Sequence, residues 1–217
     1  MLIQQIIQAI HPLQVIGNTE NLQSIDIRHL LTDSRQLGNE PEATLFFALK
    51  TAKNDGAKYI HQLIQRGVKA FVLEKNSLDQ IDHLDQLVFL VVDSSLVALQ
   101  QLAAYKRSLY HGPVIGITGS NGKTVVKEWL YQLLKDDYRI TRSPKSYNSQ
   151  IGVPLSVWQL SEETELAIFE AGISEMGEMA RLQPIIQPTI GVITYIGHEH
   201  GENFPSLEVK RAEKMQI

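Results

Sequence analysis

The chain has 217 residues, a formal net charge of -4, 43% hydrophobic residues and no cysteine. The lack of cysteine excludes disulfides, Cys-based zinc sites, iron–sulfur clusters and thiol nucleophiles, while seven histidines leave a histidine–carboxylate metal site open. The slightly acidic balance argues against a protein devoted to non-specific DNA binding, although a local basic pocket is compatible with it. No apolar run is long enough for a transmembrane helix, and the N-terminus has no basic start of a signal peptide. We therefore expect a cytoplasmic protein without a nucleic-acid or membrane partner.

The first part of the chain, roughly residues 1–112, predicts a small α/β domain. An apolar stripe at helical spacing favours an amphipathic helix at the start, and it is formed by Leu2, Ile3, Ile6, Ile7 and Ile10. Short apolar runs predict strands at 24–27, 44–49, 69–73 and 87–92. Between the second and third of these runs, residues 57–65 predict a helix that ends at Gly67.

A domain junction is predicted at residues 112/113. The stretch from Ser95 to Tyr110 carries one apolar stripe and predicts a helix. Gly112 and Pro113 follow it as a helix-stop signal, and a new apolar run begins at Val114. We expect one domain over residues 1–112 and a second over 113–217.

The second part alternates regularly between apolar strands and helices. Strands are predicted at 114–118, 138–142, 165–170 and 190–196. Helices are predicted at 122–135, 150–160, 177–187 and from about 206. This alternation is typical of a parallel sheet that is covered by helices on both faces. In such sheets ligands bind beyond the carboxyl ends of the strands, where all the candidate residues lie.

A glycine-rich loop, GITGSNGKT at 116–124, gives the strongest functional signal. It follows a predicted strand and opens a predicted helix, which is the setting of a phosphate-binding P-loop. Glycines let the backbone amides approach phosphate oxygens, the lysine can reach the β- and γ-phosphates, and the threonine hydroxyl can bind Mg²⁺. The predicted nucleotide-binding residues are Gly119, Ser120, Asn121, Gly122, Lys123 and Thr124.

The loop departs from the general P-loop pattern at one position. The pattern G-x-x-x-x-G-K-[ST] places a glycine at 117, where this chain has Ile117. The alternative is therefore a glycine-rich strand-to-helix turn that carries Gly-Lys-Thr by chance.

The loop resembles the ATP loop of the Mur ligases, which add amino acids or dipeptides to UDP-muramoyl peptides in peptidoglycan synthesis. Further stretches resemble motifs of that family in the same order: Asp33-Ser34-Arg35 with LFFAL at 45–49 and Asp55-Gly56, SYNSQIGVP at 146–154, Glu170-Ala171-Gly172, and IGHEH at 196–200. The resemblance spans nearly the whole chain. It implies an α/β fold, in which a small uridine-nucleotide-binding domain precedes part of a P-loop parallel-sheet ATP-binding domain.

The resemblance also implies cofactors and substrates. ATP and Mg²⁺ would be the cofactors, and UDP-N-acetylmuramoyl-tripeptide and D-alanyl-D-alanine the substrates. A family central domain is longer and a third domain follows it, so we expect these residues to be the N-terminal portion of a longer ligase and inactive in ligation alone. Some bacteria fuse such a ligase to an alanine racemase, a question that residues 1–217 leave open.

Three residues are implied to act at the ATP site. Glu170 would bind magnesium near the γ-phosphate, and the alternative is a solvated acid at a strand end. His200 would bind metal or phosphate, or is an ordinary loop histidine; His198 aligns less well. In related ligases the lysine at the position of Lys214 is carbamylated and becomes a magnesium ligand, whereas a helix lysine is otherwise usually solvated.

Two further groups are implied to contact the muramoyl substrate. Asp33, Ser34 and Arg35 would contact the uridine diphosphate, with a surface Asp–Arg pair as the alternative. Asn148 and Ser149 are candidates for substrate contact, but they precede a predicted helix and are equally suited to capping it.

Two other functions stay open at this point. One is a nucleotide-binding module without catalysis, and the other is a different P-loop NTPase or kinase. A kinase has no need of a uridine-nucleotide domain, so binding of a UDP-sugar by residues 1–112 would separate these hypotheses.

Overall fold

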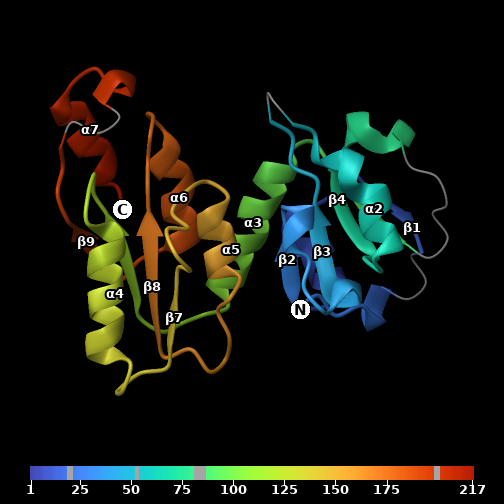
Figure 1. Cartoon of the computed structure of the whole chain (residues 1–217), viewed down its shortest axis with the longest axis horizontal. Helices are drawn as coiled ribbons and strands as arrows, with labels where there is room; N and C mark the ends of the chain where they lie inside the picture. Colours follow the sequence, from blue (N-terminus) through green and yellow to red (C-terminus); the bar gives the residue numbers. More distant parts are fainter. Residues whose placement is uncertain (19–21, 52–53, 81–86, 198–200) are drawn as a thin grey trace. The chain divides into compact units, whose positions relative to one another are not determined.

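The computed structural model describes residues 1–18, 22–51, 54–80, 87–197 and 201–217. The chain divides into two compact units, Met1–Leu102 and Ala103–Ile217, and each is described by itself (Figure 1). The division falls inside a helix, α3 (Ser95–Ser108), ahead of the junction predicted at 112/113. The functional domain limits stay a prediction. No helix in the described ranges is long and apolar enough to cross a membrane.

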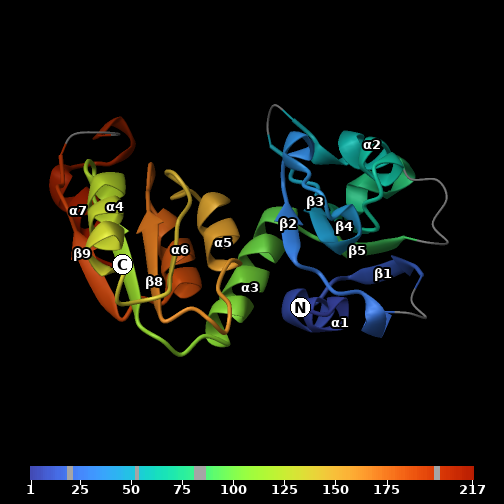
Figure 2. The same ribbon diagram turned by 60° about the horizontal axis from the view of Figure 1, so that its bottom comes forward.

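The first unit is built on a mixed sheet. Its strands are β1 (Gln14–Gly17), β2 (His29–Leu31), β3 (Thr44–Phe47), β4 (Ala70–Glu74) and β5 (Val88–Val92). They lie in the order β1-β5-β4-β3-β2, and β1 alone runs antiparallel to its neighbour among the described strands. The helices α1 (Ile3–Ile10) and α2 (Ile60–Gln65) lie on opposite sides of the sheet (Figure 2). Short 3₁₀ turns lie at Leu22–Ser24, Ser34–Gln36, Pro41–Ala43, Gly56–Tyr59 and Lys75–Gln80.

Most predicted elements of the first unit are confirmed, but one strand is wrong. Residues 24–27 contribute a 3₁₀ turn and a single bridge between Leu2 and Asp26 instead of a strand. The reason is local: the N-terminal ammonium binds the Asp26 carboxylate at 2.7 Å, and the Ile3 amide donates to the Ile25 carbonyl. This segment therefore pairs with the start of α1, and the sheet takes β2 instead. Strands β1 and β2 were not predicted.

The second unit is a fully parallel sheet, as predicted. Its strands are β6 (Val114–Thr118), β7 (Ile140–Arg142), β8 (Leu166–Ala171) and β9 (Ile190–Ile193), in the order β7-β8-β6-β9. Its helices are α4 (Lys123–Leu134), α5 (Gly152–Val157), α6 (Glu178–Ile186) and α7 (Leu207–Lys214), with a 3₁₀ turn at Gly201–Asn203.

The helices that follow β6 and β8 cover opposite faces of this sheet (Figure 1). On one face, α4 packs its Val126 and Leu130 against Ile117 and Ile168. On the other, α5 and α6 pack against a cluster that includes Phe169. Adjacent parallel strands whose following helices diverge in this way open a crevice at their carboxyl ends. The fold therefore places a ligand-binding crevice between the ends of β6 and β8.

Arg107 ties the last turn of α3 to the end of α6. Its guanidinium donates to the carbonyls of Ile186 and Gln187, both at 2.7 Å, and of Tyr110 at 2.6 Å. Because Arg107 is buried, water cannot replace these hydrogen bonds at low cost.

We expect Arg107→Ala to lower the free energy of unfolding by about 3 kcal/mol, because three carbonyls lose a charged donor. Chemical denaturation measures the change. Arg66→Ala removes one hydrogen bond from an exposed arginine to the Ser34 carbonyl and serves as the control. Equal losses in the two variants would contradict this role of Arg107.

Candidate active site

The loop between β6 and α4 adopts a conformation that requires glycine. Gly119 and Gly122 have φ angles of 144° and 85°, in the region that side chains rarely adopt. A Cβ at Gly119 would lie 2.0 Å from Thr194 Oγ1. The glycines therefore serve both the turn and the close approach of the segment that follows β9.

The segment that follows β9 holds the loop in place through hydrogen bonds. The Ser120 amide donates to the Tyr195 carbonyl at 2.5 Å, and Thr194 Oγ1 donates to the Asn121 carbonyl at 2.6 Å. Ser120 Oγ accepts from the Gly197 amide at 3.0 Å. The loop is thus held in shape by its neighbours, with its conformation set before a ligand arrives.

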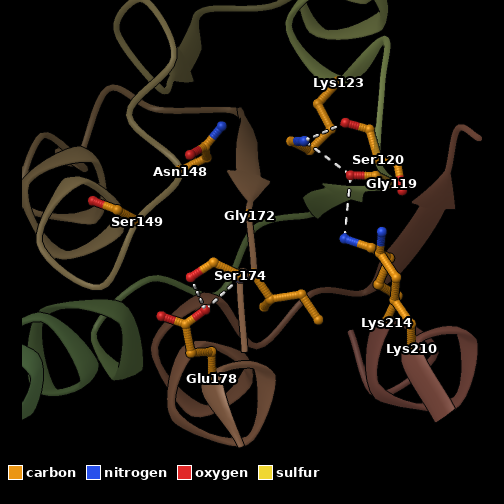
Figure 3. A pocket seen from close by; sticks show the side chains of 11 residues that line it. Gly119, Ser120, Lys123, Asn148, Ser149, Gly172, Ser174, Glu178, Lys210 and Lys214 are labelled. Atoms are coloured by element: carbon orange, nitrogen blue, oxygen red, sulfur yellow. Dashed lines mark hydrogen bonds between the residues drawn. The ribbon is translucent and has the colours of Figure 1, made fainter. Parts of the chain in front are cut away.

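Three lysines converge on the crevice beside this loop, as Figure 3 shows. Lys123 Nζ donates to the carbonyls of Gly119 at 2.9 Å and Ser120 at 3.2 Å. Lys214 Nζ donates to the same Gly119 carbonyl at 3.3 Å, and Lys210 Nζ donates to Gly197 at 2.7 Å. The cavity has a volume of about 300 Å³. Its cationic wall suits a polyanion such as a triphosphate.

Glu170 faces the P-loop helix, where the sequence placed it. Its side chain is fully buried at the end of β8, and Thr124 Oγ1 donates to its Oε2 at 3.0 Å. Asn148 Nδ2 donates to the same oxygen at 3.4 Å. Glu170 Oε1 accepts no hydrogen bond from the described residues, although the Lys127 ammonium lies 2.9 Å away as an ion-pair partner.

This pair of oxygen donors fits magnesium. Mg²⁺ prefers oxygen ligands, and it often takes one or two carboxylates and keeps several water or phosphate oxygens. A buried carboxylate whose Oε2 lies 3.0 Å from a threonine hydroxyl supplies that chemistry. Within the described residues no group of three histidine, aspartate or glutamate side chains forms a larger metal cluster. His198 and His200 lie outside the described residues.

The opposite wall of the cavity was missed by the sequence analysis. Glu178 Oε2 accepts hydrogen bonds from the amide and hydroxyl of Ser174, at 2.5 and 3.0 Å (Figure 3). Glu213 Oε1 accepts from the amides of Gly177 and Met179 at the start of α6, which fastens α7 and its two lysines beside the crevice. A carboxylate at a helix N-terminus is the signal that could have suggested Glu178.

In the structure Asn148 and Ser149 have different hydrogen-bond partners. Ser149 Oγ accepts from the amide of Gly152, the first residue of α5, at 3.1 Å, although the N-cap residue of that helix is Ile151. Asn148 instead reaches the Glu170 carboxylate, and its carbonyl accepts from the Gly172 amide at 2.7 Å. Both residues line the cavity.

In the first unit, Asp33 and Arg35 form the surface pair that the sequence analysis gave as the alternative. The Arg35 guanidinium contacts both carboxylate oxygens of Asp33, at 2.6 to 3.2 Å, while the arginine side chain stays 87% exposed. Ser34 is buried, and its carbonyl accepts from Arg66. Neither observation tests contact with a uridine nucleotide, which stays a prediction.

Two family models match this chain. The Mur ligase middle domain matches residues 117–217, and the catalytic domain of the Mur ligase family matches residues 26–107. Together with the parallel sheet and its P-loop, these matches show that the chain belongs to the Mur ligase family.

Within that family, several similar relatives and solved structures carry the name of one kind of ligase. UDP-N-acetylmuramoyl-tripeptide–D-alanyl-D-alanine ligases from Borreliella burgdorferi and Bacillus subtilis are both 34% identical, over 99% and 93% of this chain and 47% and 43% of their own lengths. A crystal structure of MurF from Acinetobacter baumannii aligns at a TM-score of 0.83 with 29% identity, over 99% of this chain and 45% of that one. MurF from Thermotoga maritima in complex with ADP aligns at 0.75 with 30% identity, over 88% and 42%. This chain therefore spans about half the length of the relatives it matches.

We expect Gly119→Ala to lower the free energy of unfolding by about 3 kcal/mol and to weaken ATP binding, because the new methyl group meets Thr194 and the φ angle is strained. Thermal unfolding and nucleotide titration measure both effects. Gly38→Ala, where nothing lies within 4 Å of the added Cβ, is the control. Unchanged stability of Gly119→Ala would contradict the loop geometry.

The Asp33 carboxyl is expected to titrate far below its usual range. The hydrogen bonds from the Arg35 side chain lower its pKa from 3.8 to about 2, with the Arg35 amide contributing next. A lowered pKa means that this pair stabilises the fold above pH 3.8 and that its contribution is lost as the pH falls towards 2. An NMR titration of Asp33 measures the pKa, and Arg35→Gln should return it towards 3.8. The same pKa in both proteins would refute the pairing.

Proposed function

We propose that the protein is an ATP-dependent ligase that joins D-alanyl-D-alanine to UDP-N-acetylmuramoyl-tripeptide. The observation that carries this proposal is the contact between Thr124 Oγ1 and Glu170 Oε2 at the mouth of a preformed P-loop. It pairs a hydroxyl and a carboxylate where a nucleotide-bound magnesium ion needs them. Relatives of this name, 32–36% identical, support the choice of substrates.

The nucleotide half of the reaction follows from the loop. The backbone amides of 119–124 and the N-terminus of α4 would bind the β- and γ-phosphates. Lys123 would turn from the loop carbonyls to the phosphates and neutralise charge during transfer. Thr124 and Glu170 would hold Mg²⁺, which when bound neutralises the phosphate oxygens.

The ligation itself proceeds in two steps in this proposal. A carboxylate oxygen of the muramoyl peptide attacks the γ-phosphorus of ATP, ADP leaves, and an acyl phosphate forms. The amine of D-alanyl-D-alanine then attacks the acyl carbon, phosphate leaves, and the amine loses a proton. Transfer of this kind needs positioning and charge neutralisation rather than a covalent contribution from the protein.

The substrate contacts belong to the same proposal. Asp33, Ser34 and Arg35 would bind the uridine diphosphate, with Arg35 exchanging its Asp33 partner for phosphate. Asn148 and Ser149 would contact the muramoyl peptide from the cavity wall. We place the activity in the cytoplasm, where ATP is available.

Lys214 and His200 complete the proposed catalytic set. Lys214 is almost fully buried beside Gly119. A carbamate on its Nζ would replace this cation of the cavity wall by an anionic ligand for magnesium. Intact-mass analysis with and without bicarbonate tests the carbamate, which adds CO₂ to one lysine. For His200 the family resemblance is the sole support.

We expect Lys123→Ala to abolish ATP turnover and leave the fold intact, because the ammonium acts on phosphate while the loop is shaped by backbone contacts. Phosphate release by the complete protein, with both substrates present, measures turnover. Lys135→Ala removes an exposed lysine beyond the end of the same helix and serves as the control. Undiminished turnover in Lys123→Ala would refute the loop assignment.

The same assay separates the other functions. Phosphate release that requires both UDP-N-acetylmuramoyl-tripeptide and D-alanyl-D-alanine supports the ligase. Release that ignores both substrates indicates a different NTPase. Nucleotide binding without release indicates a binding module.

A further inference from the structure

Lys127 is a buried cation of the second unit that contacts Glu170. It lies on α4, one turn beyond Lys123, and its side chain has no exposed surface. Its Nζ donates to the Ser143 carbonyl at 2.8 Å and to the Lys145 carbonyl. It also lies 2.9 Å from Glu170 Oε1 and 3.2 Å from Glu128 Oε1.

Three of these partners come from two parts of the sheet's carboxyl edge, and the fourth, Glu128, follows Lys127 on α4. Glu170 belongs to the end of β8, and Ser143 and Lys145 belong to the segment that leaves β7. Lys145 has a φ of 50°, an uncommon conformation for a side-chain-bearing residue, and its carbonyl is held by the ammonium. The same segment continues to Ser146, whose Oγ lies 3.3 Å from Thr124 Oγ1.

Lys127 gives the two oxygens of the Glu170 carboxylate different surroundings. Oε1 faces the buried ammonium, while Oε2 faces Thr124 and Asn148. Mg²⁺ takes near-octahedral geometry and retains waters, so coordination by a single oxygen of the carboxylate suits it best. A buried carboxylate without its cation would be costly, and it would turn towards other donors.

We propose that Lys127 is a positioning residue that holds Glu170 so that Oε2 is presented to magnesium. This inference rests on the proposed function, because it assigns Glu170 to the metal. The role is indirect: Lys127 contacts the carboxylate and not the nucleotide. Partners of metal ligands commonly change metal affinity by about 10- to 100-fold when removed.

The test measures how much MgCl₂ the complete protein needs to bind a non-hydrolysable ATP analogue. We expect Lys127→Met to raise the half-saturating Mg²⁺ concentration by about tenfold or more. Binding of the analogue in EDTA should change less than threefold, because the P-loop contacts stay in place. Lys135→Met, an exposed lysine beyond the end of the same helix, should leave the Mg²⁺ requirement unchanged.

A double variant keeps the test valid if Lys127→Met folds poorly. Lys127→Met with Glu170→Gln leaves no unpaired buried charge, so in the metal-free protein it should unfold at a higher temperature than Lys127→Met alone. Because Lys127 acts through Glu170, the double variant should need the same Mg²⁺ concentration as Glu170→Gln alone, within about twofold. Independent losses that multiply would overturn the inference.

The measurements separate a failure of this inference from a failure of the proposed function. If the wild-type protein shows no Mg²⁺-dependent binding of the analogue, the proposed function and this inference both fall. If the wild type binds it and Lys127→Met keeps the wild-type Mg²⁺ requirement, this inference alone is overturned.

Discussion

The Glu170 carboxylate is the group on which the arrangement of the site depends. It is fully buried, and it meets Thr124 from the P-loop helix, Asn148 from the segment after β7, and the ammonium of Lys127. Removing a charge of this kind from water costs several kcal/mol, which partners must offset. The parallel register brings these partners close to Glu170, because it pairs Glu170 with Ile117, one residue before the end of β6. A polar centre is therefore built where two strands end side by side.

The second constraint is the backbone of the loop itself. Thr194 occupies the space that a side chain at 119 would need, and its hydroxyl binds the Asn121 carbonyl. The loop thus depends on β9 as well as on β6. The lysines of α7 bind the Gly119 and Gly197 carbonyls, which links the last described helix to the same point. The shape of the loop in this unit therefore depends on the whole carboxyl edge of the sheet, and the nine-residue motif is one part of that edge.

Much of this could be predicted from the sequence, for a physical reason. Buried parallel strands read as apolar runs, so β6 and β8 were located to within a residue or so, and the glycines marked the turn. Glu170 was found because it interrupts an apolar strand at its end. Lys127 was not recognised as part of the site, because a lysine in an amphipathic helix is normally solvated. At four positions of α4 the usual pattern is inverted: Val125, Trp129 and Leu133 are exposed while Lys127 is buried. Its burial is decided by Glu170, which is distant in sequence. The prediction of a strand at 24–27 was wrong for a similar reason, because a contact distant in sequence decides the structure there: the N-terminal ammonium binds Asp26.

The most direct measurement is a crystal structure of the complete protein with an ATP analogue and Mg²⁺. The account predicts the β- and γ-phosphates on the amides of 119–124, and a metal ion bound by Thr124 Oγ1 and Glu170 Oε2, with Lys127 still on Oε1. A nucleotide bound elsewhere, with residues 119–124 pointing away from its phosphates, would contradict it.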